Sequence, residues 1–159
     1  MQSLFGNYIQ TQLKPLTVSS TSGGPKVNKS ILLKTLTLPV FNYYRDLFYR
    51  LDPLTGTYVK IIPSNIRELL SAEALAAFIM GDGNFQPGVN TVRIYTNGFT
   101  HADVVLLRAA IESKFGIHVG VRHDRKDQYI LAIGALNIDK LRRLVLPFME
   151  PSMLHRIGL

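Results

Sequence analysis

The sequence predicts an α+β protein in which a complete αββαββα segment follows a shorter, incomplete one. Apolar residues make up 47% of the 159 residues, which is enough for a packed core. From residue 71 onward the hydrophobic periodicity changes in the order helix, two strands, helix, two strands, helix. Before residue 71 it indicates only a helix, a strand, a possible second strand and a helix. We therefore expect two parts, residues 1–70 and 71–159.

The first part has few regular patterns. Apolar residues at helical spacing predict a helix over 4–13, which Pro15 stops. A polar, basic loop is expected over 16–30, because this stretch is rich in Gly and Ser. Residues 31–38 are expected to form a strand, 40–50 a helix and 58–62 a short extended piece. The first part thus looks like the second without its opening helix and hairpin.

The second part carries clearer signals. Ser71 is expected to cap a helix through Met80, and residues 91–96 form the clearer strand of the following hairpin. Thr100 and Asp103 form a capping-box variant at the start of the next helix, which Gly116 closes. Strands are expected over 118–124 and 128–135, and a last helix from Asn137. The buried stripes of the last two helices are predicted to be Val104, Leu107, Ile111 and Phe115, and Ile138, Leu141, Leu144 and Val145.

The charge balance favours a polyanionic partner, with solubility alone as the alternative. The net charge is +7 and the pI is near 9.8. The surplus lies mainly in residues 1–70, which contain eight basic and three acidic residues. The absence of cysteine excludes disulfides and thiolate metal sites, and the four histidines have no metal-ligand spacing. No apolar run approaches the ~20 residues that span a membrane, and residues 1–12 show no secretory signal.

The segment 75–83, LAAFIMGDG, combines close-packing residues with one acid. Ala77 and Gly81 lie one helical turn apart, so a second helix could approach closely there. Asp82 stands where the helix stops, and an Asp in that place can ligate a divalent metal through oxygen. The alternative is a core helix followed by an ordinary Asp-Gly turn.

This segment resembles the motif of the LAGLIDADG homing endonucleases, with Ala77 at the first Gly position and Gly81 at the Ala position. Residues 58–85 resemble the stretch that leads into the second motif of the family's single-chain branch. Residues 96–122 resemble its second strand, connecting helix and third strand, and residues 144–159 its closing segment. The resemblance covers nearly the whole chain.

The resemblance implies that two motif helices pack side by side and that each delivers one Asp to divalent metals such as Mg²⁺. Asp82 matches the metal-binding Asp of the second motif. Lys60 matches a catalytic-site lysine, although a solvated lysine at a strand end is the alternative. The family's sheets form a saddle on nucleic acid, and an organellar location, first of all the mitochondrion, is implied.

The sequence departs from the family pattern in three places. Met1 falls after the point where the first motif helix and its hairpin are expected, so one Asp and the partner of Ala77 and Gly81 are missing from the chain. Arg156 stands at a family lysine position and is preceded by His155, where Tyr is usual; Arg stays charged but does not exchange protons near neutral pH. The hairpin after Gly83 is short. We therefore expect little cleavage by this chain alone.

Polar and basic residues on or beside the two hairpins of the second part are candidates for nucleic-acid contact, although each alone could be solvated surface. They are Asn84, Gln86, Arg93, Tyr95, Arg122, His123, Arg125, Lys126 and Tyr129. A further basic stretch is formed by Lys26, Lys29 and Lys34.

Three functions remain open at this point. The favoured one is a DNA- or RNA-binding protein, cleavage-deficient alone, of the maturase or mitoribosomal ribonucleoprotein type. The alternative is an intron-encoded, metal-dependent DNA endonuclease completed by a second chain that carries the first motif. A protein–protein module is the third. All three require a partner on the helix of residues 75–83, either a first-motif chain or a second copy.

Overall fold

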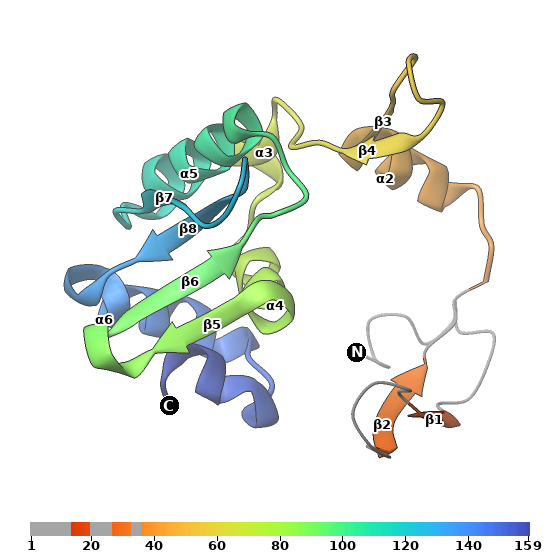
Figure 1. Cartoon of the computed structure of the whole chain (residues 1–159). Helices are drawn as coiled ribbons and strands as arrows, with labels where there is room; N and C mark the ends of the chain where they lie inside the picture. Colours follow the sequence, from red (N-terminus) through yellow and green to blue (C-terminus); the bar gives the residue numbers. More distant parts are fainter. Residues whose placement is uncertain (1–13, 20–26, 33–35) are drawn as a thin grey trace. The chain divides into compact units, whose positions relative to one another are not determined.

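The structure is a computed structural model that describes residues 14–19, 27–32 and 36–159, with side chains from residue 36 onward. The helix predicted over 4–13 lies outside the described residues, as do Lys26 and Lys34. The chain divides into two compact units between Arg45 and Asp46. Figure 1 labels the helices and strands along the chain. Each unit is described by itself.

The first unit contains a hairpin where a loop was predicted. β1 (Lys14–Ser19) pairs antiparallel with β2 (Val27–Leu32), so most of the predicted loop 16–30 that is described is strand. The strand expected over 31–38 is wrong in its bounds, because β2 ends at Leu32 and residues 36–38 are not strand. Loop composition does not reveal pairing between two polar segments, because register depends on a partner strand. α2 (Val40–Phe48) confirms the helix predicted over 40–50, yet none of its residues is buried.

The second unit confirms the predicted order of elements from residue 71. Its parts are β3 (Tyr49–Leu51), β4 (Tyr58–Lys60), α3 (Ile66–Leu69), α4 (Ala72–Asp82), β5 (Gly83–Gln86), β6 (Thr91–Tyr95), α5 (His101–Phe115), β7 (Gly120–His123), β8 (Tyr129–Ile133) and α6 (Ala135–Val145). The 3-10 segments are η2 (Pro87–Val89), η3 (Leu146–Phe148) and η4 (Pro151–Ile157). The periodicity did not indicate α3 or η4, since each is short.

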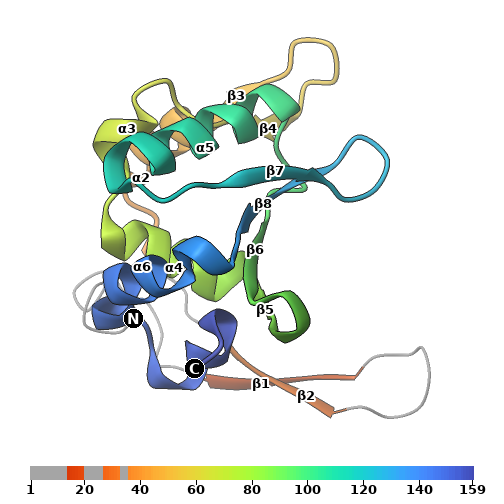
Figure 2. The ribbon, with the colours of Figure 1, turned by 90° about the vertical axis from the view of Figure 1, so that its left-hand side faces the viewer.

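A four-stranded antiparallel sheet with the order β5-β6-β8-β7 forms the centre of this unit. The predicted α+β class is therefore confirmed, and the strand pairs of the described residues are all antiparallel. Figure 2 shows α4, α5 and α6 on one side of this sheet. Within residues 46–159 no helix or strand covers the opposite side, and we call it the open face.

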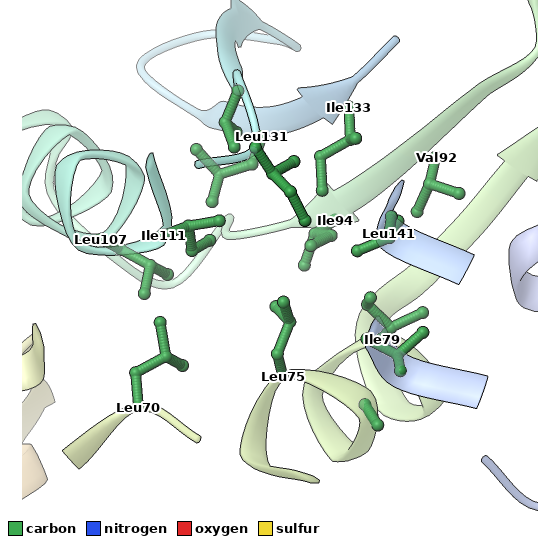
Figure 3. Packing of buried hydrophobic residues seen from close by; sticks show 14 of the residues in the cluster. Leu70, Leu75, Ile79, Val92, Ile94, Leu107, Ile111, Leu131, Ile133 and Leu141 are labelled. Carbon is green, nitrogen blue, oxygen red and sulfur yellow. The ribbon is translucent and has the colours of Figure 1, made fainter. Parts of the chain in front are cut away.

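The core lies between the sheet and these helices, as Figure 3 shows. Leu75 and Ile79 of α4 and Ile94 of β6 are fully buried. Burying each such side chain contributes about 1.5–3 kcal/mol. The predicted stripes of α5 and α6 face this core, with Phe115 and Leu144 only partly buried at its margin.

Most predicted caps are present. The Ser71 hydroxyl accepts a hydrogen bond from the Ala74 amide (3.0 Å), and Thr100 and Asp103 form a full capping box. Gly116 ends α5 in the left-handed conformation. The predicted start of the last helix at Asn137 is wrong, since α6 begins at Ala135.

The core also includes the segment before α4. Ile62, Ile66 and Leu70 are buried in the same cluster as α4 and α5. The compact unit therefore begins at Asp46, whereas the division into parts 1–70 and 71–159 concerns the repeat of two halves and stays a prediction.

The two glycines around Asp82 have opposite surroundings. A Cβ on Gly83 would lie 2.4 Å from the Ile79 carbonyl oxygen, whereas one on Gly81 would meet no atom within 4 Å. We expect Gly83→Ala to lower the free energy of unfolding by about 1–3 kcal/mol, because backbone has to move. Gly81→Ala should raise it by up to about 1 kcal/mol, since Ala is the better helix former.

Chemical denaturation of the two variants and the wild-type chain measures both effects. Equal unfolding free energies for Gly83→Ala and Gly81→Ala would contradict the close approach of Gly83 to α4.

Candidate nucleic-acid interface and acidic pocket

Asp82 and Lys60 line one pocket of 220 Å³. Asp82 ends α4, and Lys60 is the last residue of β4, so the pocket joins elements that are distant in sequence. Both side chains are exposed to solvent. The other lining residues are mostly aromatic or apolar: Phe48, Tyr49, Ile61, Phe78 and Phe99.

The loop between β6 and α5 supports Lys60. A Cβ on Gly98 would lie 3.7 Å from Cδ of Lys60, so the aliphatic part of the lysine runs beside the Gly98 backbone. Phe99 of the same loop lines the pocket. The pocket therefore combines an ammonium group and a carboxylate with a largely apolar wall.

Arg156 is held close to the same end of α4. Its Nη1 donates a 2.7 Å hydrogen bond to the Gly83 carbonyl, directly after Asp82. Its Nε is buried and makes no hydrogen bond among the described residues. The guanidinium thus ties η4 to the start of β5, and Arg156 is not among the residues that line the pocket.

The outward face of α4 carries small residues, with the exposed Glu73 of the first turn beside them. Ala74, Ala77 and Gly81 are exposed and lie on one side of the helix, opposite Leu75 and Ile79. An exposed helix face is usually polar. The predicted close-contact residues Ala77 and Gly81 are therefore accessible in this unit.

The antiparallel register brings five of the predicted contact residues to the open face. Asn84 pairs with Arg93, which pairs with Ala132, and Ala132 pairs with Gly120. Opposite residues in such pairs point to the same side. The five residues on this face are Asn84, Gln86, Arg93, Tyr95 and Arg122.

A hollow of 610 Å³ lies on this face. Arg93 and Arg122 line it, and Gly120 and Ala132 leave room between them. Asp124 contributes a carboxylate at the rim, which lies 3.6 Å from Nε of Arg125. The hollow thus combines two guanidinium groups with a floor of small residues, a surface that suits phosphates and base edges.

The remaining predicted contacts lie elsewhere. Tyr129 is partly buried against the core between His101 and His123, with ring centroids 4.3 and 5.6 Å away. His123 lines the end of the hollow, but its register position is on the side that faces the helices. Arg125 and Lys126 occupy the turn between β7 and β8, where Lys126 has a positive φ of 48°.

Sequence patterns missed His118 and the aromatic lining of the pocket. His118 lines the hollow, is 80% exposed and lies 2.8 Å from a Glu112 carboxylate oxygen. The sequence pattern did not predict that His118, which precedes β7, lines the hollow. Its position there depends on the pairing of β7 with β8. Phe78 and Phe99 lie in helix and loop patterns that are typical of core residues, so these patterns did not predict that the two rings line a pocket.

Among the described residues, no group of three or more His, Cys, Asp or Glu side chains could hold a metal ion. In the described part of the chain, every helix is too short or too polar to cross a membrane. Asp82 offers one carboxylate, which can be one ligand of an ion that takes others from water and phosphate.

Comparisons with known proteins agree with this geometry. The chain matches the model of the LAGLIDADG DNA endonuclease family over residues 1–141. It is 30% identical to the intron-encoded endonuclease ai4 of Dictyostelium discoideum, over 79% of this chain and 75% of that protein. It is 26% identical to the cytochrome b mRNA maturase bI2 of Saccharomyces cerevisiae, over 99% of this chain but only 38% of the maturase.

A solved structure has the same fold. The homing endonuclease I-WcaI, bound to its DNA recognition sequence, superposes with a TM-score of 0.81 at 20% identity, over 98% of this chain and 68% of that one. With the family match over most of the sequence, the chain belongs to the LAGLIDADG DNA endonuclease family.

Proposed function

We propose that this chain binds nucleic acid through the open face of its four-stranded sheet and does not cleave it alone. The observation that carries the proposal is the register that brings Asn84, Arg93 and Arg122 to the open face, where Arg93 and Arg122 line a hollow of 610 Å³. Arg neutralises phosphates, and Asn, Gln and Arg bind base edges. Arg125 and Lys126 extend the basic surface at the β7–β8 turn.

Two roles fit such a surface. The first is an RNA- or DNA-binding component of the maturase or ribonucleoprotein type, which the maturase relatives support. The second is a DNA endonuclease that a second chain completes, which the endonuclease relatives support. The order β1, β2, α2 repeats the order β7, β8, α6 that closes the second part. This order supports a division into two similar halves, and the single acid in the pocket of Asp82 favours the first role for the chain alone.

For catalysis, Asp82 would be one ligand of a divalent cation, with water, phosphate oxygens and a carboxylate of another chain as the others. When bound, such an ion stabilises charge on a reacting phosphate. Lys60, across the same pocket, would hold a phosphate oxygen by its ammonium group. In this arrangement Arg156 would contribute only indirectly, by its hydrogen bond to the Gly83 carbonyl next to Asp82.

A protein partner would cover the small-residue face of α4. Ala77 and Gly81 are the expected close contacts, and the partner is a first-motif chain or a second copy of this one. An exposed apolar strip of this kind supports such a partner. The intron-encoded and cytochrome b-related relatives support an organellar location, and we propose the mitochondrion.

The salt dependence of nucleic-acid binding tests the proposed surface directly. We expect duplex DNA or structured RNA to bind at low salt and to dissociate steeply as salt rises, because counterions are released. Replacing Arg93 and Arg122 with Ala should weaken binding. It should also lower the slope of log affinity against log salt by about one for each phosphate that is no longer neutralised.

Arg143→Ala is the matched control, since Arg143 is exposed on α6, on the helical side of the sheet. It removes one charge but no open-face side chain. If the double variant binds as tightly as the control, or if neither nucleic acid binds at low salt, the proposed surface is wrong.

A further inference from the structure

Asp103 has two sets of contacts at the start of α5. One carboxylate oxygen, Oδ2, accepts hydrogen bonds from the Thr100 hydroxyl (2.6 Å) and the Thr100 amide (3.3 Å), which completes the capping box. The other, Oδ1, accepts a 3.1 Å hydrogen bond from the amide of Ile62, which lies 41 residues earlier. A capping box needs only the first set.

The Ile62 contact fixes the chain just after Lys60. Lys60 is the last residue of β4, and the Ile61 amide donates to the Phe48 carbonyl (2.9 Å). The next amide, that of Ile62, donates to Asp103, and the Ile62 side chain is buried in the core. Two successive amides after Lys60 therefore have fixed partners.

The start of α5 also follows directly on the β6–α5 loop, which lies beside the Lys60 side chain. Gly98 and Phe99 directly precede Thr100, and the aliphatic part of Lys60 runs beside Gly98. Asp103 thus binds the backbone after Lys60 and, through Thr100, the loop beneath it. One carboxylate therefore binds both the segment after β4 and the residue that ends the β6–α5 loop.

We propose that Asp103 is the positioning residue for Lys60: it aligns the end of β4 with the β6–α5 loop so that the lysine stands in the pocket of Asp82. This inference rests on the proposed function only in so far as that function gives the pocket of Asp82 a role in binding metal and phosphate. The alignment itself needs neither metal nor nucleic acid.

The experiment compares two variants of the full 159-residue chain by NMR. Thr100→Val removes the hydroxyl of the capping box but leaves the Asp103–Ile62 hydrogen bond. Asp103→Ala removes both. We expect the Ile62 amide to exchange with solvent about tenfold faster in Asp103→Ala than in Thr100→Val, as removal of a hydrogen bond to a charged group requires. Nuclear Overhauser effects between the Lys60 side chain and Gly98 should persist in Thr100→Val and disappear in Asp103→Ala.

The wild-type chain gives a second measurement that does not depend on a variant folding. A scalar coupling across the hydrogen bond should join the Ile62 nitrogen to the Asp103 carboxyl carbon. Absence of that coupling, or equal Ile62 exchange and equal Lys60–Gly98 Overhauser effects in the two variants, would overturn the proposal. A failure of Arg93 and Arg122 to affect nucleic-acid binding would instead overturn the proposed function and leave this result unchanged.

Discussion

Incubated alone with Mg²⁺ and a randomised DNA library, the 159-residue chain is expected to make no sequence-specific double-strand cut. The two-metal reaction stabilises both the attacking and the leaving oxygen, and for this it needs carboxylates on both sides of the metals. The pocket that Lys60 lines contains a single acid, Asp82.

Adding a chain that carries the first motif should produce specific cutting, and Asp82→Asn should reduce that cutting to background. Asn keeps the size of the side chain but has no charge, which a divalent ion requires. Glu68→Gln, which neutralises an exposed acid of α3 rather than of α4, is the control and should cut normally. Specific cutting by the lone wild-type chain that disappears in Asp82→Asn would contradict the proposed lack of cleavage.

Ala77→Leu is expected to prevent the α4 partner from binding. Ala77 is exposed beside Gly81, where no atom of the described residues lies within 4 Å of an added Cβ. A Leu there should fold normally in the lone chain, yet overpack a close helix pair by about 1–3 kcal/mol. That cost corresponds to roughly 5- to 150-fold weaker association.

Sedimentation equilibrium of the chain, alone and with any copurified protein, measures this association. Ala109→Leu makes the same change at an exposed position of α5 and should leave association unchanged. A wild-type chain that stays monomeric and binds no protein, or an Ala77→Leu chain that associates like wild type, would contradict a partner on α4.

Local rules predicted much of the second part because its helix ends depend on neighbouring residues. Ser71, the Thr100–Asp103 pair and Gly116 act within one turn of their helices, so their positions follow from sequence. Asn137 was expected to start α6, but its Oδ1 accepts from the His118 amide at 3.2 Å instead of capping the helix. The His118 amide belongs to another segment, so the local sequence pattern around Asn137 does not indicate this hydrogen bond.

The candidate site was predictable as a set of residue types but not as an arrangement. The family motif predicted Asp82, the match around residues 58–63 predicted Lys60, and both line one pocket. Which polar residues share the open face depends on the register of β5, β6, β7 and β8, and a shift by one residue would turn each strand over. Tyr129, for example, was expected among the contact residues, but it is partly buried and its ring packs against the rings of His101 and His123.

Mapping the nucleic-acid contact by NMR tests the central claim most directly. Titrating the ¹⁵N-labelled chain with duplex DNA and, separately, with structured RNA reports which amides respond. We expect the largest shifts at Asn84, Arg93 and Arg122 and at the β7–β8 turn, with small shifts in α5 and α6. Shifts confined to the helices, or none at low salt with either nucleic acid, would contradict binding through the open face.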